Sequence, residues 1–146
     1  MEKMLNGWKQ FLIEQVSYQG ILKISPSPDN ISDLEAIQAF LPEEAIRLKS
    51  YDFHVTLIHQ SILKPFQKML QDISLPDAPS ISLDDEIFER REPGKKSWAV
   101  RLTNQEEMRD YIGEVMKLLG SSNTDPEPER VFHVSLANLT GNPQDS

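Results

Sequence analysis

The chain contains no cysteine, which excludes disulfide bonds, thiolate zinc sites and cysteine nucleophiles. This absence is in keeping with a reducing cytoplasm. Apolar runs of membrane-spanning length, about 20 residues, are missing as well, and the opening Met1-Glu2-Lys3 does not begin a secretion signal. These observations favour a cytoplasmic protein that has no membrane partner.

Basic residues are also scarce, because 15 Lys and Arg face 23 Asp and Glu, a formal net charge of −8 at pH 7. Proteins that bind long DNA or RNA usually have a basic stripe, since neutralised phosphates supply most of their affinity. Here basic residues gather only at Arg90-Arg91 and Lys95-Lys96. The balance favours a small phosphorylated ligand in one local pocket over a long nucleic acid, although acidity also serves solubility alone.

The most informative feature that is present is a repeated pentapeptide. Phe53-His54-Val55-Thr56-Leu57 recurs near the C-terminus as Phe132-His133-Val134-Ser135-Leu136. Aromatic and β-branched residues around a polar pair predict a short, mostly buried strand in each copy. Side chains alternate along a strand, so each histidine shares a face with its hydroxyl residue. Two such strands placed side by side would direct two imidazoles and two hydroxyls into one cleft.

The apolar flanks, rather than the His-x-Ser/Thr pattern itself, make these two copies distinctive. The chain's third histidine also fits the pattern in His59-Gln60-Ser61, but Gln60 interrupts the apolar run. If the first strand continues through Ile58, His59 faces the side opposite to His54. Buried histidines at strand centres are often satisfied core residues, and this remains the alternative for either copy alone. A matched pair in distant segments favours a shared function.

Two histidines and two hydroxyls suit acid–base chemistry on a phosphodiester. Imidazole has an unperturbed pKa near 6.5, so both of its forms are populated around neutral pH. One histidine can take the proton of an attacking 2′-hydroxyl while the other protonates the departing oxygen. Thr56 and Ser135 can donate hydrogen bonds to the non-bridging oxygens. We expect no metal and no cofactor, since two histidines without a repeated carboxylate make an incomplete zinc shell.

The pair of motifs formed by His54 with Thr56 and by His133 with Ser135 resembles the two His-x-Thr/Ser motifs of the 2H phosphoesterase superfamily. This resemblance extends over residues 20–138. The stretch from Phe132 to Pro143 is similar to the end of the phage anti-CBASS (Acb-type) phosphodiesterases. The superfamily resemblance implies a pseudo-symmetric two-lobed α+β fold, with a central cleft between two small antiparallel sheets flanked by helices. The resemblance to the anti-CBASS phosphodiesterases implies metal-independent hydrolysis of 3′–5′ bonds in the cyclic di- or trinucleotides that signal in bacterial immunity. This reaction would take place in the host cytoplasm.

Further residues are candidates for substrate binding, each with a structural alternative. Aromatic side chains can stack on bases, whereas core packing is the alternative for Tyr51 and Trp98 and, less strongly, for Tyr18. Lys23 lies mid-strand and is either an edge residue or a phosphate contact. Asn138 and Thr140 shape either a ligand rim or the turn that Gly141-Asn142-Pro143 demands.

The chain reads as one domain over residues 1–146, with 38% apolar residues to fill its core. Helices are predicted over 4–16, 61–73 and 105–119, with a short helical piece over 43–49. A further helix is predicted to begin at Asn30 or Ser32, either of which can cap it, and to run through Phe40. Strands are predicted over 20–24, 51–59, 80–90 and 97–103 and at the second histidine run. Proline-bearing stretches near 74–80 and 121–130 are the predicted lobe junctions.

Two other functions fit the same residues. One keeps the chemistry and changes the substrate to RNA ends, with 2′,3′-cyclic phosphates or 2′–5′ linkages. The other is a non-catalytic sponge that sequesters cyclic nucleotides, although a sponge has no need of two intact His-x-hydroxyl sets. The sequence assigns neither acid nor base to a particular histidine and gives no sign of the oligomeric state.

Overall fold

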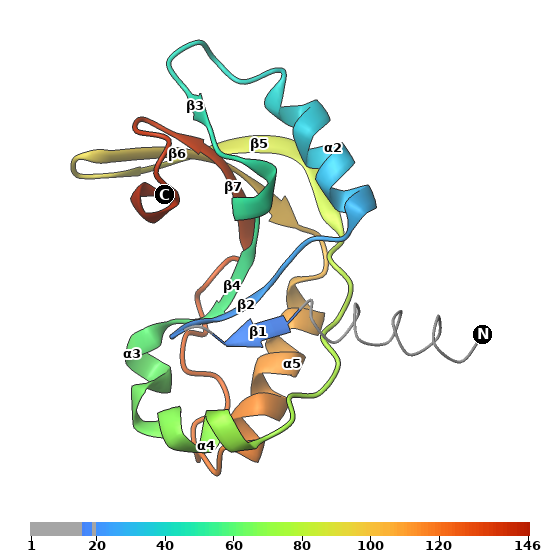
Figure 1. Ribbon diagram of the computed structural model, residues 1–146, viewed down its shortest axis with the longest axis vertical. Helices are drawn as coiled ribbons and strands as arrows, with labels where there is room; N and C mark the ends of the chain where they lie inside the picture. Colours follow the sequence, from blue (N-terminus) through green and yellow to red (C-terminus); the bar gives the residue numbers. More distant parts are fainter. Residues whose placement is uncertain (1–15, 19) are drawn as a thin grey trace. The chain divides into compact units, whose positions relative to one another are not determined.

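Residues 16–18 and 20–146 are described by the computed structural model, in which they form an α+β fold with two small antiparallel sheets (Figure 1). The helix predicted over 4–16 lies outside the described residues except for Val16, which begins the first strand. The elements in chain order are β1 (Val16–Tyr18), β2 (Leu22–Ile24), α2 (Pro28–Gln38), β3 (Ile46–Arg47), η1 (Ser50–Asp52), β4 (Val55–Ile58), α3 (Gln60–Leu63), η2 (Lys64–Phe66), α4 (Gln67–Asp72), β5 (Leu83–Glu92), β6 (Lys95–Leu102), α5 (Gln105–Leu118), β7 (His133–Asn138) and η3 (Pro143–Asp145).

The chain divides into two compact units. Among the described residues, the first consists of 16–18, 20–25, 56–80 and 105–130, and the second of 26–55, 81–104 and 131–146. The predicted junctions near 74–80 and 121–130 end at two of the points where the chain passes from one unit to the other. Both His54 and His133 belong to the second unit.

A three-stranded sheet in the order β1-β2-β4 lies in the first unit. Leu22 and Ile24 of β2 are buried, whereas Lys23 between them is half-buried. Helix α5 is amphipathic, since its buried residues recur at the spacing of one helical face: Met108, Tyr111, Ile112, Val115 and Met116. No described helix is long and apolar enough to cross a membrane.

A four-stranded sheet in the order β3-β7-β6-β5 forms the second unit with helix α2, which packs against β5 and β7. Strands β5 and β6, which overlap the strands predicted over 80–90 and 97–103, pair with each other as an antiparallel hairpin. Strand β6 also pairs with β7, so that Arg101 lies opposite His133. Ser27 caps α2 through a capping box with Asn30, because its hydroxyl satisfies a backbone N–H that has no partner within the helix. The predicted caps, Asn30 and Ser32, were therefore placed too late.

Three predicted elements differ from the structure. The short helix predicted over 43–49 is wrong, since this segment holds β3, whose residues pair with Ala137 and Asn138 of β7. The helix predicted over 61–73 is divided into α3, η2 and α4, with Pro65 inside η2. The first histidine strand is shorter than 51–59, because η1 occupies its beginning and β4 covers only Val55–Ile58.

The two histidine strands do not pair with each other. Strand β4 belongs to the three-stranded sheet and β7 to the four-stranded sheet. The expected alternation of side chains is nevertheless present in both pentapeptides, because the burial of 53–57 and of 132–136 follows one pattern. The phenylalanine, valine and leucine of each copy are buried, and the histidine and hydroxyl residue are half-buried.

Candidate active site

His133 begins β7, and both of its ring nitrogens have partners. Nδ1 lies 3.0 Å from the backbone oxygen of Val131, and Nε2 lies 3.1 Å from Nη1 of Arg90. The ring of Phe88 meets the imidazole edge-on, with 6.0 Å between the centroids and 84° between the planes. These contacts fix the orientation of the ring.

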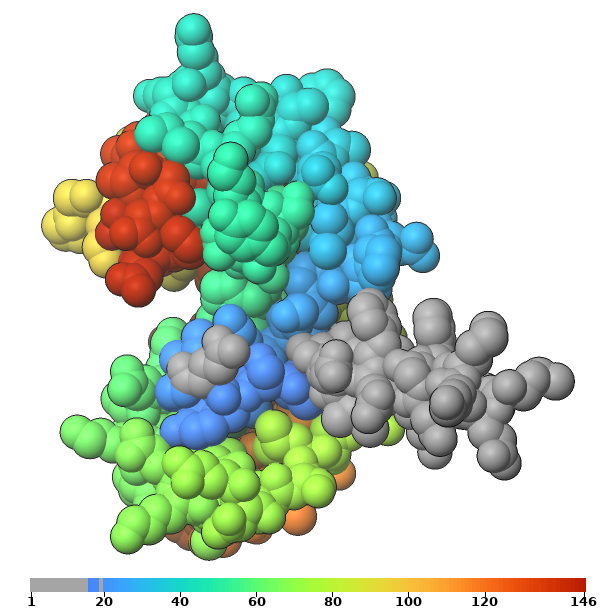
Figure 2. Space-filling model, in the orientation of Figure 1, coloured from blue at the N-terminus to red at the C-terminus, as the bar shows by residue number. Residues whose placement is uncertain are grey.

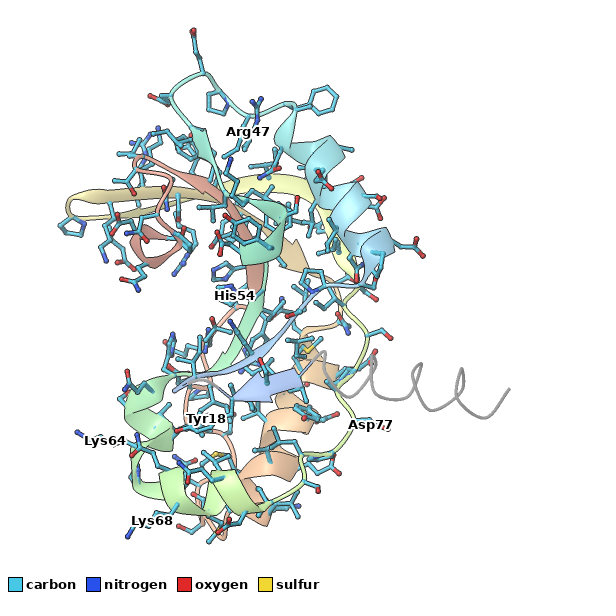
Figure 3. All side chains as sticks on the ribbon, viewed as in Figure 1. Tyr18, Arg47, His54, Lys64, Lys68 and Asp77 are labelled. Atoms are coloured by element: carbon cyan, nitrogen blue, oxygen red, sulfur yellow. The ribbon has the colours of Figure 1, made fainter. Side chains whose placement is uncertain are left out.

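His54 lies directly before β4 and is half-buried; Figure 3 labels it in that segment. Its Nδ1 lies 2.9 Å from the backbone oxygen of Asp52. In both histidines the partner of Nδ1 is thus the carbonyl two residues earlier in the chain. Within the described part of the chain, Nε2 of His54 has no hydrogen-bond partner.

The two carbonyl contacts determine the protonation of Nδ1. A carbonyl oxygen only accepts hydrogen bonds, so Nδ1 of each histidine has to be the donor. A proton transfer by either ring would therefore have to use Nε2. An arginine only donates, so the contact with Arg90 requires that Nε2 of His133 be unprotonated. Both imidazoles therefore have a proton on Nδ1, and they differ in what faces Nε2.

The two hydroxyl residues lie on strands but in different units. Ser135 is half-buried on β7, where it shares a face with His133, and Thr56 is half-buried on β4 of the first unit. Neither hydroxyl makes a hydrogen bond to a described residue. A hydroxyl without a protein partner is available to donate to a ligand oxygen.

A basic face surrounds His133 in the second unit. Residues directly opposite each other in paired strands, and residues two apart along a strand, share a face of the sheet. By these registers one face carries the following residues, which we call the His133 face: His133 and Ser135 of β7, Ser97, Ala99 and Arg101 of β6, and Phe88 and Arg90 of β5. The sequence analysis missed Arg101 and gave Arg90 no role, because strand register cannot be read from one sequence.

Trp98 lies on the opposite face of the same sheet and is only 2% exposed. The ammonium of Lys96 lies 4.9 Å from its ring centroid, and the same ammonium pairs with Glu44 at 3.0 Å. Core packing, the alternative stated for Trp98, is what this burial favours. Tyr51, in contrast, is 84% exposed in η1. The core-packing alternative is therefore wrong for Tyr51.

Tyr18 and Lys23 lie on β1 and β2 of the first unit, and both are half-buried. Lys23 pairs with Ser17 in the strand register and Tyr18 with Leu22. Lys23 therefore lies on the less buried face of its sheet, since its neighbours Leu22 and Ile24 face the core. Figure 3 labels Tyr18 at the end of β1.

Asn138 is fully buried at the end of β7 and organises the turn that follows. Its Oδ1 accepts from the backbone N–H groups of Thr140 and Gly141, at 3.0 and 2.6 Å, while Nδ2 donates to the backbone oxygen of Asn142 at 2.6 Å. These bonds use both ends of the amide, which favours the turn-forming alternative. Gly141 has φ 79°, a conformation that few residues other than glycine adopt.

Thr140 lies at a small pocket of about 170 Å³, where residues 139–146, red in Figure 2, meet the yellow tip of the β5–β6 hairpin. Its hydroxyl donates to Oδ2 of Asp145 at 2.7 Å. The pocket is lined by Gly94, Lys95, Lys96, Leu139, Thr140 and Asp145. Because Asp145 brings a carboxylate to the two lysines, this pocket is a poorer place for a phosphate than the His133 face.

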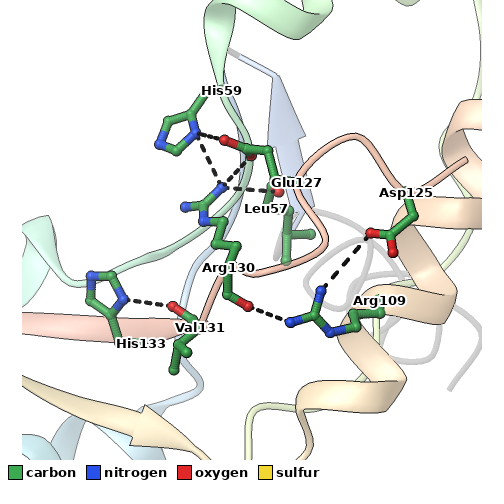
Figure 4. A network of polar contacts seen from close by, with 8 residues as sticks. All are labelled: Leu57, His59, Arg109, Asp125, Glu127, Arg130, Val131 and His133. Carbon is green, nitrogen blue, oxygen red and sulfur yellow. Dashed lines mark hydrogen bonds and ion pairs between the residues drawn. The ribbon is translucent and has the colours of Figure 1, made fainter. Parts of the chain in front are cut away.

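His59 has a separate structural role in the first unit (Figure 4). It lies after the end of β4, and its Nδ1 is 2.8 Å from Oε1 of Glu127. Arg130 donates to Oε2 of Glu127 at 3.1 Å and to the backbone oxygen of Leu57 at 3.2 Å. Together these bonds attach the end of the 121–130 loop to β4. His59, the histidine of the chain's third His-x-Ser pattern, thus helps to hold the 121–130 loop in place.

Among residues 16–18 and 20–146, no group of three or more histidine, aspartate or glutamate side chains is arranged to hold a metal ion. Within the second unit the candidate site residues are His54, His133 and Ser135, with Arg90 in contact with His133, whereas the fourth candidate, Thr56, belongs to the first unit. Comparisons with protein-family models, curated proteins and solved structures find no match to this chain.

Proposed function

We propose that this protein is a metal-independent phosphodiesterase of the 2H type that cleaves the 3′–5′ bonds of cyclic di- or trinucleotides. The acid–base chemistry is supported by the geometry of the two imidazoles. The cyclic substrate, and a role in helping a phage to evade bacterial immunity within the host cytoplasm, are supported mainly by the resemblance of residues 132–143 to the phage anti-CBASS phosphodiesterases.

The observation that carries the proposal is the matched attachment of the two histidines. Nδ1 of His54 and Nδ1 of His133 each donate to the carbonyl two residues earlier, at 2.9 and 3.0 Å. A buried histidine with a purely structural role has hydrogen-bond partners for its polar atoms, whereas Nε2 of His54 makes no hydrogen bond to a described residue. A histidine that transfers protons needs such an arrangement, with the ring fixed through one nitrogen and the other nitrogen facing the substrate. Two copies of one attachment, in segments far apart in the sequence, favour a pair that works together.

The proposed reaction is an internal transesterification. A ribose 2′-oxygen attacks the neighbouring phosphorus, one imidazole Nε2 takes the 2′-hydroxyl proton, and the bond from phosphorus to the 5′-oxygen breaks. The other imidazole, which starts protonated, gives its Nε2 proton to that leaving oxygen. The product is a 2′,3′-cyclic phosphate, which water can then open to a 3′-phosphate. Thr56 and Ser135 donate to the non-bridging oxygens as their charge grows.

A nucleotide substrate is also supported by Tyr51. This side chain is 84% exposed and belongs to η1, the turn whose residue Asp52 supplies the carbonyl partner of His54. An exposed aromatic ring can stack on a base, which contributes about 1–3 kcal/mol per base. The net charge of −8 favours a ligand with few phosphates over a long nucleic acid.

The experiment is to incubate the purified protein with a cyclic dinucleotide that has one 2′–5′ and one 3′–5′ linkage, and to identify the products by mass spectrometry. We expect opening at the 3′–5′ bond only, with a 2′,3′-cyclic phosphate or 3′-phosphate terminus. The matched control is the analogue that lacks the 2′-hydroxyl beside the 3′–5′ bond, which should remain intact.

Three results would contradict the proposal in different ways. A 5′-phosphate terminus, or efficient cleavage of the 2′-deoxy analogue, would mean that water attacks phosphorus directly. Conversion of linear RNA with a 2′,3′-cyclic phosphate end, with cyclic dinucleotides untouched, would indicate an RNA-end enzyme. Tight binding of a cyclic dinucleotide without turnover would indicate a sponge.

A further inference from the structure

The His133 face concentrates positive charge in an acidic protein. Arg101 lies directly opposite His133 in the β6–β7 register, and Arg90 reaches His133 from β5 with Nη1 3.1 Å from Nε2. The carboxylate in contact with Arg90 is that of Glu92, at 4.0 Å, with side chains 36% and 65% exposed. An ion pair this long and this exposed is weak, so Glu92 leaves most of the charge of Arg90 available.

Phe88 holds the guanidinium of Arg101 and the imidazole of His133 in one arrangement. The guanidinium carbon of Arg101 lies 4.4 Å from the Phe88 ring centroid, a favourable cation–π contact. The same ring meets the edge of the His133 imidazole. An anion placed beside Nε2 of His133 would therefore meet guanidinium groups that are already positioned.

We propose that Arg90 and Arg101 form the binding subsite for the phosphodiester anion beside His133, and that His133 is the general base and His54 the general acid. The inference rests on the proposed function for its reaction. A guanidinium presents several donors in one plane, a shape that suits the non-bridging oxygens of a phosphodiester. The subsite thus takes a phosphate group that carries one negative charge.

The contact between Arg90 and His133 also separates the roles of the two histidines. Because Arg90 can only donate, Nε2 of His133 begins the cycle without a proton, which is the state that a base requires. When the substrate binds, its charged oxygens are better acceptors than a neutral imidazole, so Arg90 turns to the phosphate. The lone pair of Nε2 then accepts the 2′-hydroxyl proton, and His54 supplies the proton for the leaving oxygen.

The binding test uses the His54→Ala protein, which should bind without turnover, and a cyclic diadenylate with two 3′–5′ bonds as probe in calorimetry. Adding Arg90→Ala should weaken binding by about 10- to 100-fold, the loss expected for a hydrogen-bonded charge pair. Arg90→Lys should fall between, because lysine keeps the charge but not the planar donors. The matched control is Arg91→Ala, which changes net charge equally on the opposite face, where Arg91 pairs with Glu89 at 3.2 Å.

The outcomes separate the subsite from the proposed reaction. If the wild type cleaves the probe and Arg90→Ala binds as well as Arg91→Ala does, the subsite is wrong and the proposed function stands. If the wild type cleaves nothing but binds the probe in an Arg90-dependent way, the reaction is wrong and the subsite stands. If the probe does not bind at all, both are wrong. Equal thermal midpoints for the two arginine variants establish that the binding difference is local.

The acid and base are distinguished with a substrate whose leaving 5′-oxygen is replaced by sulfur. A thiol has a pKa near 8.5, so a thiolate departs without needing a proton, and the general acid becomes dispensable. We expect the sulfur substrate to restore turnover of His54→Ala by about 100-fold relative to the oxygen substrate and to leave His133→Ala inactive. Restoration of His133→Ala instead would reverse the assignment and overturn it.

Discussion

Gln38, the last residue of α2, joins three segments of the second unit through one buried amide. Its Nε2 donates to the backbone oxygen of Leu48 at 3.0 Å and to that of Leu136 at 2.9 Å, and Leu136 lies in the histidine strand β7. Changing Gln38 to Glu replaces the donating amide by a carboxylate that only accepts. Both partners are carbonyl oxygens that also only accept, so both hydrogen bonds are lost.

The expected loss of stability follows from these contacts. Each hydrogen bond contributes about 0.5–1.5 kcal/mol net, so the two bonds account for about 1–3 kcal/mol. The side chain is only 7% exposed, so the new carboxylate is also desolvated against two oxygens that repel it. We expect Gln38→Glu to lose at least about 3 kcal/mol of unfolding free energy at pH 7, and Gln38→Met, which adds no charge, about 1–3 kcal/mol.

The loss from Gln38→Glu should depend on pH. Burial beside two carbonyl oxygens raises the pKa of the new carboxyl above its unfolded value of about 4.3. A group whose pKa is raised in the folded state contributes most below its unfolded pKa, and its contribution is lost as the pH rises. Relative to the wild type, the variant should therefore be least impaired near pH 4 and progressively worse toward pH 7.

Urea unfolding followed by circular dichroism at pH 4.5 and at pH 7 measures both effects. The control is Gln67→Glu, the same chemical change at the exposed first residue of α4, which should change stability by less than about 0.5 kcal/mol. The reasoning is refuted if Gln38→Glu is as stable as this control at pH 7, or if its deficit is equally large at both pH values.

Further predictions concern the histidines, metal and alkaline stability. His54→Ala and His133→Ala should each reduce turnover by at least about 100-fold with the fold intact, and near-normal turnover by either variant would disprove the two-histidine mechanism. Turnover by His59→Ala should stay within a few-fold of the wild type, because His59 is bonded to Glu127 at the 121–130 loop. Turnover should be unaffected by excess EDTA, since both proton transfers are assigned to imidazoles; activity that vanishes with chelator and returns with zinc would overturn this. Burial and two nearby carboxylates raise the pKa of Tyr111, whose hydroxyl donates to the backbone oxygen of Pro76 at 2.7 Å. Wild-type stability should therefore fall more steeply above pH 10 than that of Tyr111→Phe, which itself loses about 1 kcal/mol at pH 7; parallel alkaline curves would contradict that.

The sequence predicts those elements whose own residues decide their structure. Helix α5 has a continuous apolar face over four turns, and Gly120 lies just after its end with φ 76°. The spacing of the apolar residues therefore predicts the helix, and the glycine predicts where it ends. The β5–β6 hairpin is predicted by its alternation and by the turn at Pro93-Gly94. Both pentapeptides also have the expected alternation of burial, since β-branched and aromatic residues bury one side of a short strand.

The wrongly predicted elements are those that distant partners decide. Residues 43–49 have no strand pattern of their own, and β3 exists because Ile46 and Arg47 pair with β7 and the backbone N–H of Leu48 donates to Leu136 at 2.9 Å. Gln38 adds its two bonds at the same place. A single sequence contains no signal for such pairing, whereas its local propensities still suggest helix.

The chemistry of the candidate site is likewise only partly contained in the motif. The repeat predicts the candidate residues, and the same carbonyl contact in both copies makes His54 and His133 equivalent at Nδ1. What makes them unequal is the neighbour at Nε2, and that neighbour is Arg90, brought to His133 by the pairing of β5 with β6 and of β6 with β7. A repeated motif by itself supplies two identical proton carriers, and a reaction that needs one base and one acid requires an asymmetry from outside the repeat. In the reaction proposed for this protein, the guanidinium of Arg90, which can only donate, is the source of that asymmetry.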